Sequence, residues 1–130
     1  MSDPKKARHG LIVGEAHAGP AVVLSAAGTI DMVTAPQLQT HVDNVLSRQP
    51  AALIIDLSRV EFLGSAGINV LVNAHNESGA VAFAVAADGP ATSRPLRLLG
   101  LDNLLQIYPS VTDAVDGLSA GVGDDVSEAG

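Results

Sequence analysis

Apolar residues in the middle of the chain follow strand-like and helix-like spacing in turn. Two short apolar segments are joined by the turn-prone sequence GEAHAGP and predict a pair of strands. Three further runs of strand length follow, and the continuous ones are typical of strands buried on both faces of a parallel or mixed sheet. The five predicted strands cover residues 11–13, 21–26, 51–57, 80–87 and 104–108.

Four segments with helical spacing alternate with these strands. Thr34 is predicted to cap the first helix, and Gln37 three residues later completes a capping box, with Pro36 tolerated in the first turn and Pro50 ending the unit. The other three helices are predicted to begin near Ser65, Thr92 and Ser110. This order predicts an α/β sandwich with right-handed crossovers, built on a mixed, mostly parallel sheet of about five strands with four helices.

Length and composition limit the possible domain organisation and the kind of partner. The chain has 130 residues and is 47% hydrophobic, which suits one domain with a sizeable core. We expect residues 10–118 to form that domain, residues 1–9 to be a flexible lead and residues 119–130 to be a disordered acidic tail. The net charge of −7 repels nucleic-acid backbones and anionic lipid. Direct nucleic-acid binding and membrane binding are therefore not expected.

Several features missing from the sequence exclude whole classes of chemistry. The chain contains no cysteine, so disulfides, thiolate catalysis and thiolate metal sites are ruled out. Its four histidines show no metal-ligand spacing, and neither a metal nor another cofactor is expected. No apolar run reaches the roughly 20 residues of a membrane span, and the N-terminal sequence lacks the apolar core of a signal peptide. We therefore expect a cytoplasmic protein.

The stretch VEFLGSAGINVL, residues 60–71, places one hydroxyl among the smallest side chains. Ser65 lies beside Gly64, Ala66 and Gly67, where a buried strand is predicted to end and a helix to begin. A serine in this position commonly caps the helix and contributes about 1 kcal/mol. The same position suits a phosphate, because a helix N-terminus presents free N–H groups and the positive end of the helix dipole. The small neighbours would let a partner lie against the neutral serine and be rejected by the phosphorylated one, a role compatible with capping.

A nucleophilic role for Ser65 is not expected. The nucleophile elbow G-x-S-x-G requires glycine two residues before the serine, and Leu63 stands there. A serine nucleophile also needs a base within hydrogen-bond reach. His75 lies on the same predicted helix, about 15 Å away at 1.5 Å rise per residue. We therefore expect the chain not to be an enzyme.

Three segments, in the same order and spacing, resemble the STAS domain of bacterial anti-sigma-factor antagonists. LIIDLSRVEFLGSAGINVLVNA is similar to the family signature, in which an aliphatic strand, Asp-Leu-Ser, a hydrophobic pair and a serine-containing turn lead into a helix. AAGTIDMVTAPQLQTHV is similar to an earlier segment of that family, and RLLGLDNLLQIYPSVTDAV to its closing segment. The resemblance covers roughly residues 11–118 and implies a STAS-like sandwich.

The resemblance also implies a function and a set of site residues. In that family the antagonist binds an anti-sigma factor that is also a serine kinase of the histidine-kinase-like ATPase fold, and the sigma factor is freed. The kinase phosphorylates the serine of the turn, the antagonist is released, and a phosphatase resets it. Carried across, Ser65 is the phosphoacceptor. The partner-binding residues would be Asp31, Thr34, Gly64, Ser65, Ala66, Gly67 and Asn69.

The sequence departs from the family pattern on both sides of the serine. The family usually has Asp before the phosphorylated serine and Ser or Thr after it, where this chain has Gly64 and Ala66. We therefore expect Ser65 to be phosphorylated slowly, by a divergent kinase, or not at all, while partner binding survives. The alternative is a non-phosphorylated STAS module that scaffolds a larger complex or senses a small ligand. Asp56 is expected either to cap a turn or to line the site. Asn69 and Asn73 follow Ser65 at helical spacing and are expected either to flank the docking surface or to face solvent.

Overall fold

Five strands form one mixed sheet in the computed structural model, which describes residues 10–118. The strands are β1 (Leu11–Ala18), β2 (Ala21–Ile30), β3 (Ala52–Leu63), β4 (Ala82–Ala86) and β5 (Ile107–Tyr108). They lie in the order β1-β2-β3-β4-β5. β1 and β2 are antiparallel neighbours, whereas β2 to β5 run parallel to one another, so the sheet is mixed and mostly parallel as predicted.

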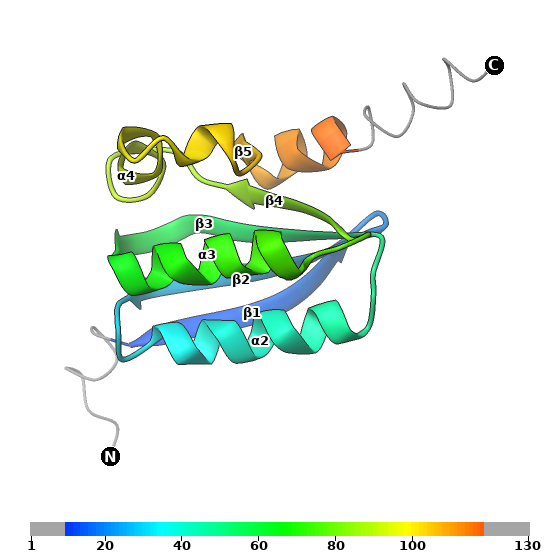
Figure 1. Cartoon of the computed structure of the whole chain (residues 1–130), viewed down its shortest axis with the longest axis horizontal. Coiled ribbons are helices and arrows are strands. Elements are labelled where there is room, and N and C mark those ends of the chain that lie inside the picture. The colour runs from blue at the N-terminus through cyan, green and yellow to red at the C-terminus, as the bar shows by residue number, and fades with distance from the viewer. Residues whose placement is uncertain (1–9, 119–130) are drawn as a thin grey trace.

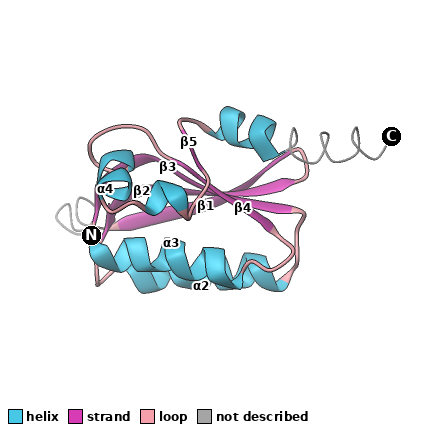
Figure 2. Ribbon diagram, turned by 45° about the horizontal axis from the view of Figure 1, so that its top comes forward, coloured by secondary structure: helices cyan, strands magenta, loops and turns pink. Residues whose placement is uncertain are grey.

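Four α-helices and a short 3-10 turn complete the described part of the chain. They are α2 (Ala35–Ser47), α3 (Ser65–Glu77), α4 (Ser93–Leu98), η1 (Leu101–Asn103) and a helix over residues 111–118. α2 and α3 cover one face of the sheet, and the helix over residues 111–118 lies against the other (Figures 1 and 2). The predicted α/β sandwich of about five strands and four helices is therefore confirmed.

Each face of the sheet carries its own apolar core. The larger core lies under α2 and α3, where Leu38 and Leu71 are fully buried against the strands. The smaller core lies under residues 111–118, where Ala114 packs with Ile54. Burial of a large aliphatic side chain contributes roughly 1.5–3 kcal/mol. A chain that is only 2% aromatic can therefore still build a stable core from Leu, Ile, Val and Ala.

Several strand boundaries differ from the prediction. β1 and β2 are longer than expected, because their backbones pair from Leu11↔Gly28 to Ala18↔Ala21 even where the side chains are small or polar. β5 is shorter than expected, because Leu105 follows the 3-10 turn and packs into the larger core before the strand begins. Apolar spacing locates residues that face a core, whereas strand length depends on the backbone pairing.

β3 runs six residues beyond the predicted end at Leu57 because its backbone is irregular. Its register with β2 shifts between Ser25 and Ala27 and again between Gly28 and Thr29. At each shift β3 has one extra residue, as at a β-bulge. The spacing of its core residues therefore changes from two to three. The residues of β3 in the larger core are Leu53, Ile55, Leu57, Val60 and Leu63.

This irregularity corrects the expected position of Asp56. The residue lies inside β3 and not at the end of the strand. Its Oδ1 accepts a hydrogen bond from the N–H of Ser58 at 3.0 Å, so it braces the first register shift. The second shift exposes both Glu61 and Phe62 between two core residues.

The start of α2 differs from the predicted capping box. The Thr34 hydroxyl occupies the N-cap position, but it donates to the Thr29 carbonyl at 2.8 Å and accepts the Asp31 N–H at 2.9 Å. The Gln37 side chain donates to the Leu11 carbonyl on β1 at 2.9 Å instead of reaching back to the cap. The predicted capping box is therefore wrong, because both side chains bind groups outside the helix.

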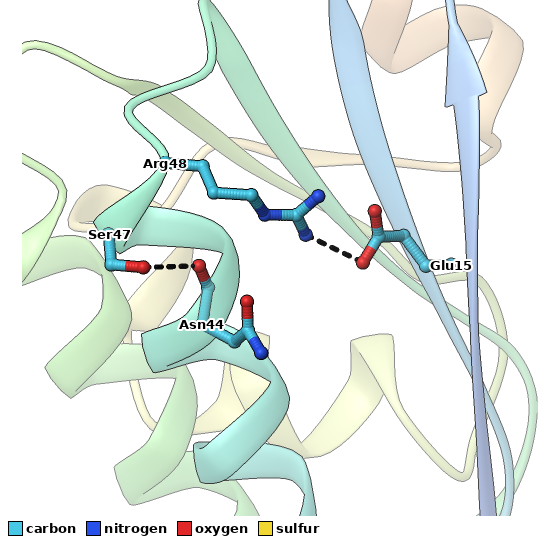
Figure 3. A network of polar contacts seen from close by, with 4 residues as sticks. All are labelled: Glu15, Asn44, Ser47 and Arg48. Carbon is cyan, nitrogen blue, oxygen red and sulfur yellow. Dashed lines mark hydrogen bonds and ion pairs between the residues drawn. The ribbon is translucent and has the colours of Figure 1, made fainter.

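The end of α2 is also tied to β1. Arg48 Nη2 lies 2.7 Å from Glu15 Oε1 (Figure 3). The hydrogen bond from Arg48 lowers the pKa of Glu15 below its ordinary value. Nearby, the Ser47 hydroxyl donates to the Asn44 carbonyl at 2.7 Å in the last turn. Since Arg48 and Glu15 are both partly exposed, their ion pair orients α2 more than it stabilises the fold.

The predicted lead, residues 1–9, and the predicted tail, residues 119–130, lie outside the described residues. Within residues 10–118 no helix is long and apolar enough to cross a membrane. The same part of the chain has no group of three or more His, Asp or Glu side chains that could hold a metal ion.

Candidate functional site

The connections that follow β2, β3 and β4 meet at one edge of the sheet. The amino ends of α2, α3 and α4 lie at this edge, on the left in Figure 1. In sheets with parallel strands, functional sites gather outside the carboxyl ends of the strands. We call this region, residues 31–34, 61–66 and 87–98, the carboxyl edge.

Ser65 is exposed at the first position of α3. The N-cap residue is Gly64, whose extended backbone donates its N–H to the Ile30 carbonyl of β2 at 2.8 Å. The Gly64 carbonyl accepts the first helical hydrogen bond, from the Ile68 N–H at 3.0 Å. The interpretation of Ser65 as the N-cap is therefore wrong, because β2 fixes Gly64 in that position. No side chain within residues 10–118 caps the first turn of α3.

The two glycines near the serine make room for neighbouring side chains. Gly67 is buried, and a Cβ built there would lie 2.5 Å from Ile30 Cγ2 and 2.7 Å from Leu63 Cδ1. A Cβ built at Gly64 would lie 3.1 Å from Cε2 of the Phe62 ring. Glycine at 67 therefore lets α3 approach β2 and β3, and glycine at 64 leaves room for an aromatic ring.

Asp31 organises the loop between β2 and α2. Its Oδ1 accepts the N–H groups of Val33 at 2.9 Å and Thr34 at 3.0 Å. The bond from the Thr34 N–H, with that from Val33, holds the pKa of Asp31 below its ordinary value of 3.8. The loop held in this way leaves Met32 and Val33 79% and 80% exposed. Asp31 therefore caps the turn that precedes α2, three residues before the cap that was predicted at Thr34.

The other predicted site residues divide into surface and buried positions. The hydrogen bond between Gly64 and Ile30 brings the Asp31 loop next to the start of α3. Ala66 and Asn69, together with Asn73, line a hollow of about 350 Å³ between α2 and α3. Thr34 and Gly67 are buried, so these two residues support the surface from below and do not form it.

Sequence reasoning missed the apolar residues that the carboxyl edge exposes. Besides Met32 and Val33, these are Phe62, which is 54% exposed, and Leu98, which is 74% exposed. Phe62 and Leu98 line one hollow of about 340 Å³ between β3 and α4. The last core residues of β3 lie three apart in the sequence, and this spacing could have predicted that Phe62 faces solvent and not the core. Asp56 lines a different hollow, on the strands β1 to β3, and does not belong to this edge.

The fold and this edge define the class of protein. The model of the STAS domain family matches residues 14–114, and the chain belongs to that family, which confirms the resemblance seen in its sequence. "Anti-sigma-F factor antagonist RsfB" of Mycobacterium tuberculosis, strains CDC 1551 / Oshkosh and ATCC 25618 / H37Rv, is 42% identical over 106 residues, which cover 81% of this chain and 86% of the relative.

Solved structures agree with this assignment. The crystal structure of an anti-sigma factor antagonist from Mycobacterium paratuberculosis has a TM-score of 0.82 and 39% identity, and the match covers 92% of this chain and 99% of that one. Bacillus SpoIIAA in the phosphorylated form has a TM-score of 0.62 over 82% of this chain and 99% of its own. At 15% identity, that second likeness shows the fold alone.

The packing of Gly67 predicts that Gly67→Ala destabilises the protein by about 1–3 kcal/mol, because the added methyl group pushes against Ile30 and Leu63. Urea unfolding followed by circular dichroism measures the change. Gly14→Ala is the matched control, since a Cβ at Gly14 meets nothing within 4 Å, and it should change stability by less than about 0.5 kcal/mol. Equal unfolding midpoints for the two variants would contradict the packing role.

The lowered pKa of Asp31 predicts a pH-dependent contribution to stability. Because this pKa is lower in the folded state than in the unfolded chain, the contribution is fully present above about pH 5 and is lost as the pH falls through the folded pKa. Asp31→Asn removes the titration while keeping an oxygen acceptor for the loop. Between pH 7 and pH 3, measured by urea unfolding, the wild type should lose more stability than Asp31→Asn. Equal losses would show that the carboxylate charge does not matter.

Proposed function

We propose that this protein is an anti-sigma-factor antagonist that binds an anti-sigma factor through the carboxyl edge and so frees a sigma factor. The observation that carries the proposal is Ser65, exposed at the start of α3 among uncharged residues, in a chain 42% identical to an anti-sigma-F factor antagonist. The protein acts in the cytoplasm as a binding protein and not as an enzyme, and its activity requires no cofactor.

The carboxyl edge offers the chemistry that such binding needs. The edge exposes four apolar side chains to water, those of Met32, Val33, Phe62 and Leu98. Covering this apolar surface with a partner contributes roughly 25 cal/mol per Å² to the free energy of binding. A specific interface buries about 800 Å² on each partner. Asp31, Asn69 and the small residues around Ser65 would complete the contact area, with the buried Thr34 and Gly67 supporting it.

Phosphorylation of Ser65 would switch the interaction off. It adds a charge of about −1.5 to −2 at neutral pH. The first turn of α3 has no side-chain cap, so its free N–H groups can donate hydrogen bonds to a phosphate and the domain tolerates the modification. An apolar partner surface cannot solvate the same charge, and binding is lost through the desolvation cost.

The resemblance to the family implies a kinase and a phosphatase as further partners. The kinase is the anti-sigma factor itself, of the histidine-kinase-like ATPase fold, and a phosphatase restores the neutral serine. Gly64 and Ala66 remove the acidic and hydroxyl groups that usually flank the serine. We therefore propose that Ser65 is phosphorylated slowly while docking of the neutral form is kept.

The test is affinity capture from host lysate with the wild type, Ser65→Ala and Ser65→Asp as baits, with retained proteins identified by mass spectrometry. An anti-sigma factor should be retained by the wild type and by Ser65→Ala and lost with Ser65→Asp, because only the last places a charge at the start of α3. Ser58→Asp is the matched control, since it adds the same charge at an exposed position within β3.

Two outcomes would contradict the proposal in different ways. Retention of the same anti-sigma factor by all four baits would leave a constitutive, scaffold-like antagonist without a switch at Ser65. Failure of the wild type to retain any anti-sigma factor would overturn the proposed function itself.

A further inference from the structure

The hollow between β3 and α4 lies beside Ser65 but on a different element from the predicted partner-binding residues. Its volume is about 340 Å³. We call it the α4 notch. The lining residues that matter here are Glu61, Phe62, Pro90, Arg94, Pro95 and Leu98.

Phe62 joins the α4 notch to the surface around the serine. In the second register shift of β3, Val60 pairs with Gly28 and Phe62 with Thr29, so Glu61 is the extra residue and Phe62 turns outward. Because position 64 is glycine, nothing displaces the ring, which lies within contact distance of where a Cβ would be. The aromatic wall of the notch therefore begins three residues before Ser65.

The other wall of the notch is held in place without a partner. Leu96 is fully buried and anchors α4 to the core. The Gly89 N–H donates to Ser93 Oγ at 2.9 Å, and that hydroxyl donates to the Gly89 carbonyl at 3.0 Å. Pro90 and Pro95 restrict the backbone on either side. An apolar group that enters such a preformed hollow pays little ordering entropy.

The charges of the notch restrict what can enter it. Arg94 lines it and forms no ion pair with any residue of the described range 10–118. A guanidinium binds carboxylates with two parallel hydrogen bonds, so it selects an acidic neighbour. Glu61 on the same hollow disfavours a carboxylate as the inserted group itself. The occupant that fits is an apolar side chain with a carboxylate beside it.

We infer that the α4 notch receives an apolar anchor side chain of the anti-sigma factor, with a neighbouring carboxylate of that partner on Arg94. The inference rests on the proposed function and names the part of the carboxyl edge that holds the partner's anchor. Binding energy in interfaces concentrates in a few anchors that fill pockets. Leu98 and Phe62 hold the anchor, while Ser65 next to them carries the switch.

The experiment purifies the anti-sigma factor that the wild type retains from host lysate and titrates it into full-length variants by isothermal calorimetry. Leu98→Ser and Ile12→Ser remove side chains of matched exposure, 74% and 73%, but Ile12 lies on β1 and lines a different hollow. We expect Leu98→Ser to raise the Kd at least about tenfold and Ile12→Ser to change it less than about twofold. Arg94→Gln should weaken binding and flatten its dependence on salt.

Each result has one interpretation. If the wild type binds, Ser65→Asp does not, and Leu98→Ser binds as tightly as Ile12→Ser, the α4 notch is overturned and the proposed function stands. If Leu98→Ser is weakened but Arg94→Gln keeps the wild-type affinity and salt dependence, the carboxylate part is overturned. If the wild type retains and binds no anti-sigma factor, the proposed function is overturned and the notch with it.

Discussion

The close approach of α3 to β2 and β3 at Gly67 is the constraint on which the carboxyl edge depends. With no Cβ at that position, Ile30 and Leu63 press directly on the first turn of α3. The hydrogen bond from Gly64 to the Ile30 carbonyl then fixes the start of the helix on β2. Ser65 consequently lies exposed at a defined place, supported by backbone and not by its own side chain. A larger residue at 67 would move the helix, and the serine would move with it.

The apolar surface around the serine has a similar backbone origin. The two register shifts of β3 turn pairs of residues outward while the strand keeps its core contacts, and this is how Phe62 comes to lie in solvent. The Asp31 loop does the same for Met32 and Val33 by satisfying its own N–H groups. Exposed hydrophobic residues on rigid supports are typical of protein interaction sites. We propose that the neutral serine within this surface permits docking and that the charge added by phosphorylation prevents it.

Much of the fold was predictable, because long apolar runs and helical spacing record which residues face a core. The junction at Ser65 was predictable for the same reason. The capping box at Thr34 was not, because its hydroxyl is used by Thr29 and Asp31, contacts that exist only after β2 and α2 have packed. The exposure of Phe62 depends on the register between two strands, which apolar spacing alone does not specify. The sequence resemblance predicted the family, while the hollow between β3 and α4 required the structure.

The proposed switch is tested by incorporating phosphoserine at position 65 during synthesis and comparing the affinity of the phosphorylated and unmodified proteins for the anti-sigma factor that the wild type retains. We expect a Kd at least about tenfold higher for the phosphorylated form. We also expect an unfolding midpoint that is unchanged or higher, because the phosphate lies at the amino end of α3. Equal affinities of the two forms would contradict the switch. A phosphorylated protein that binds poorly because it has unfolded would contradict the proposed mechanism of release.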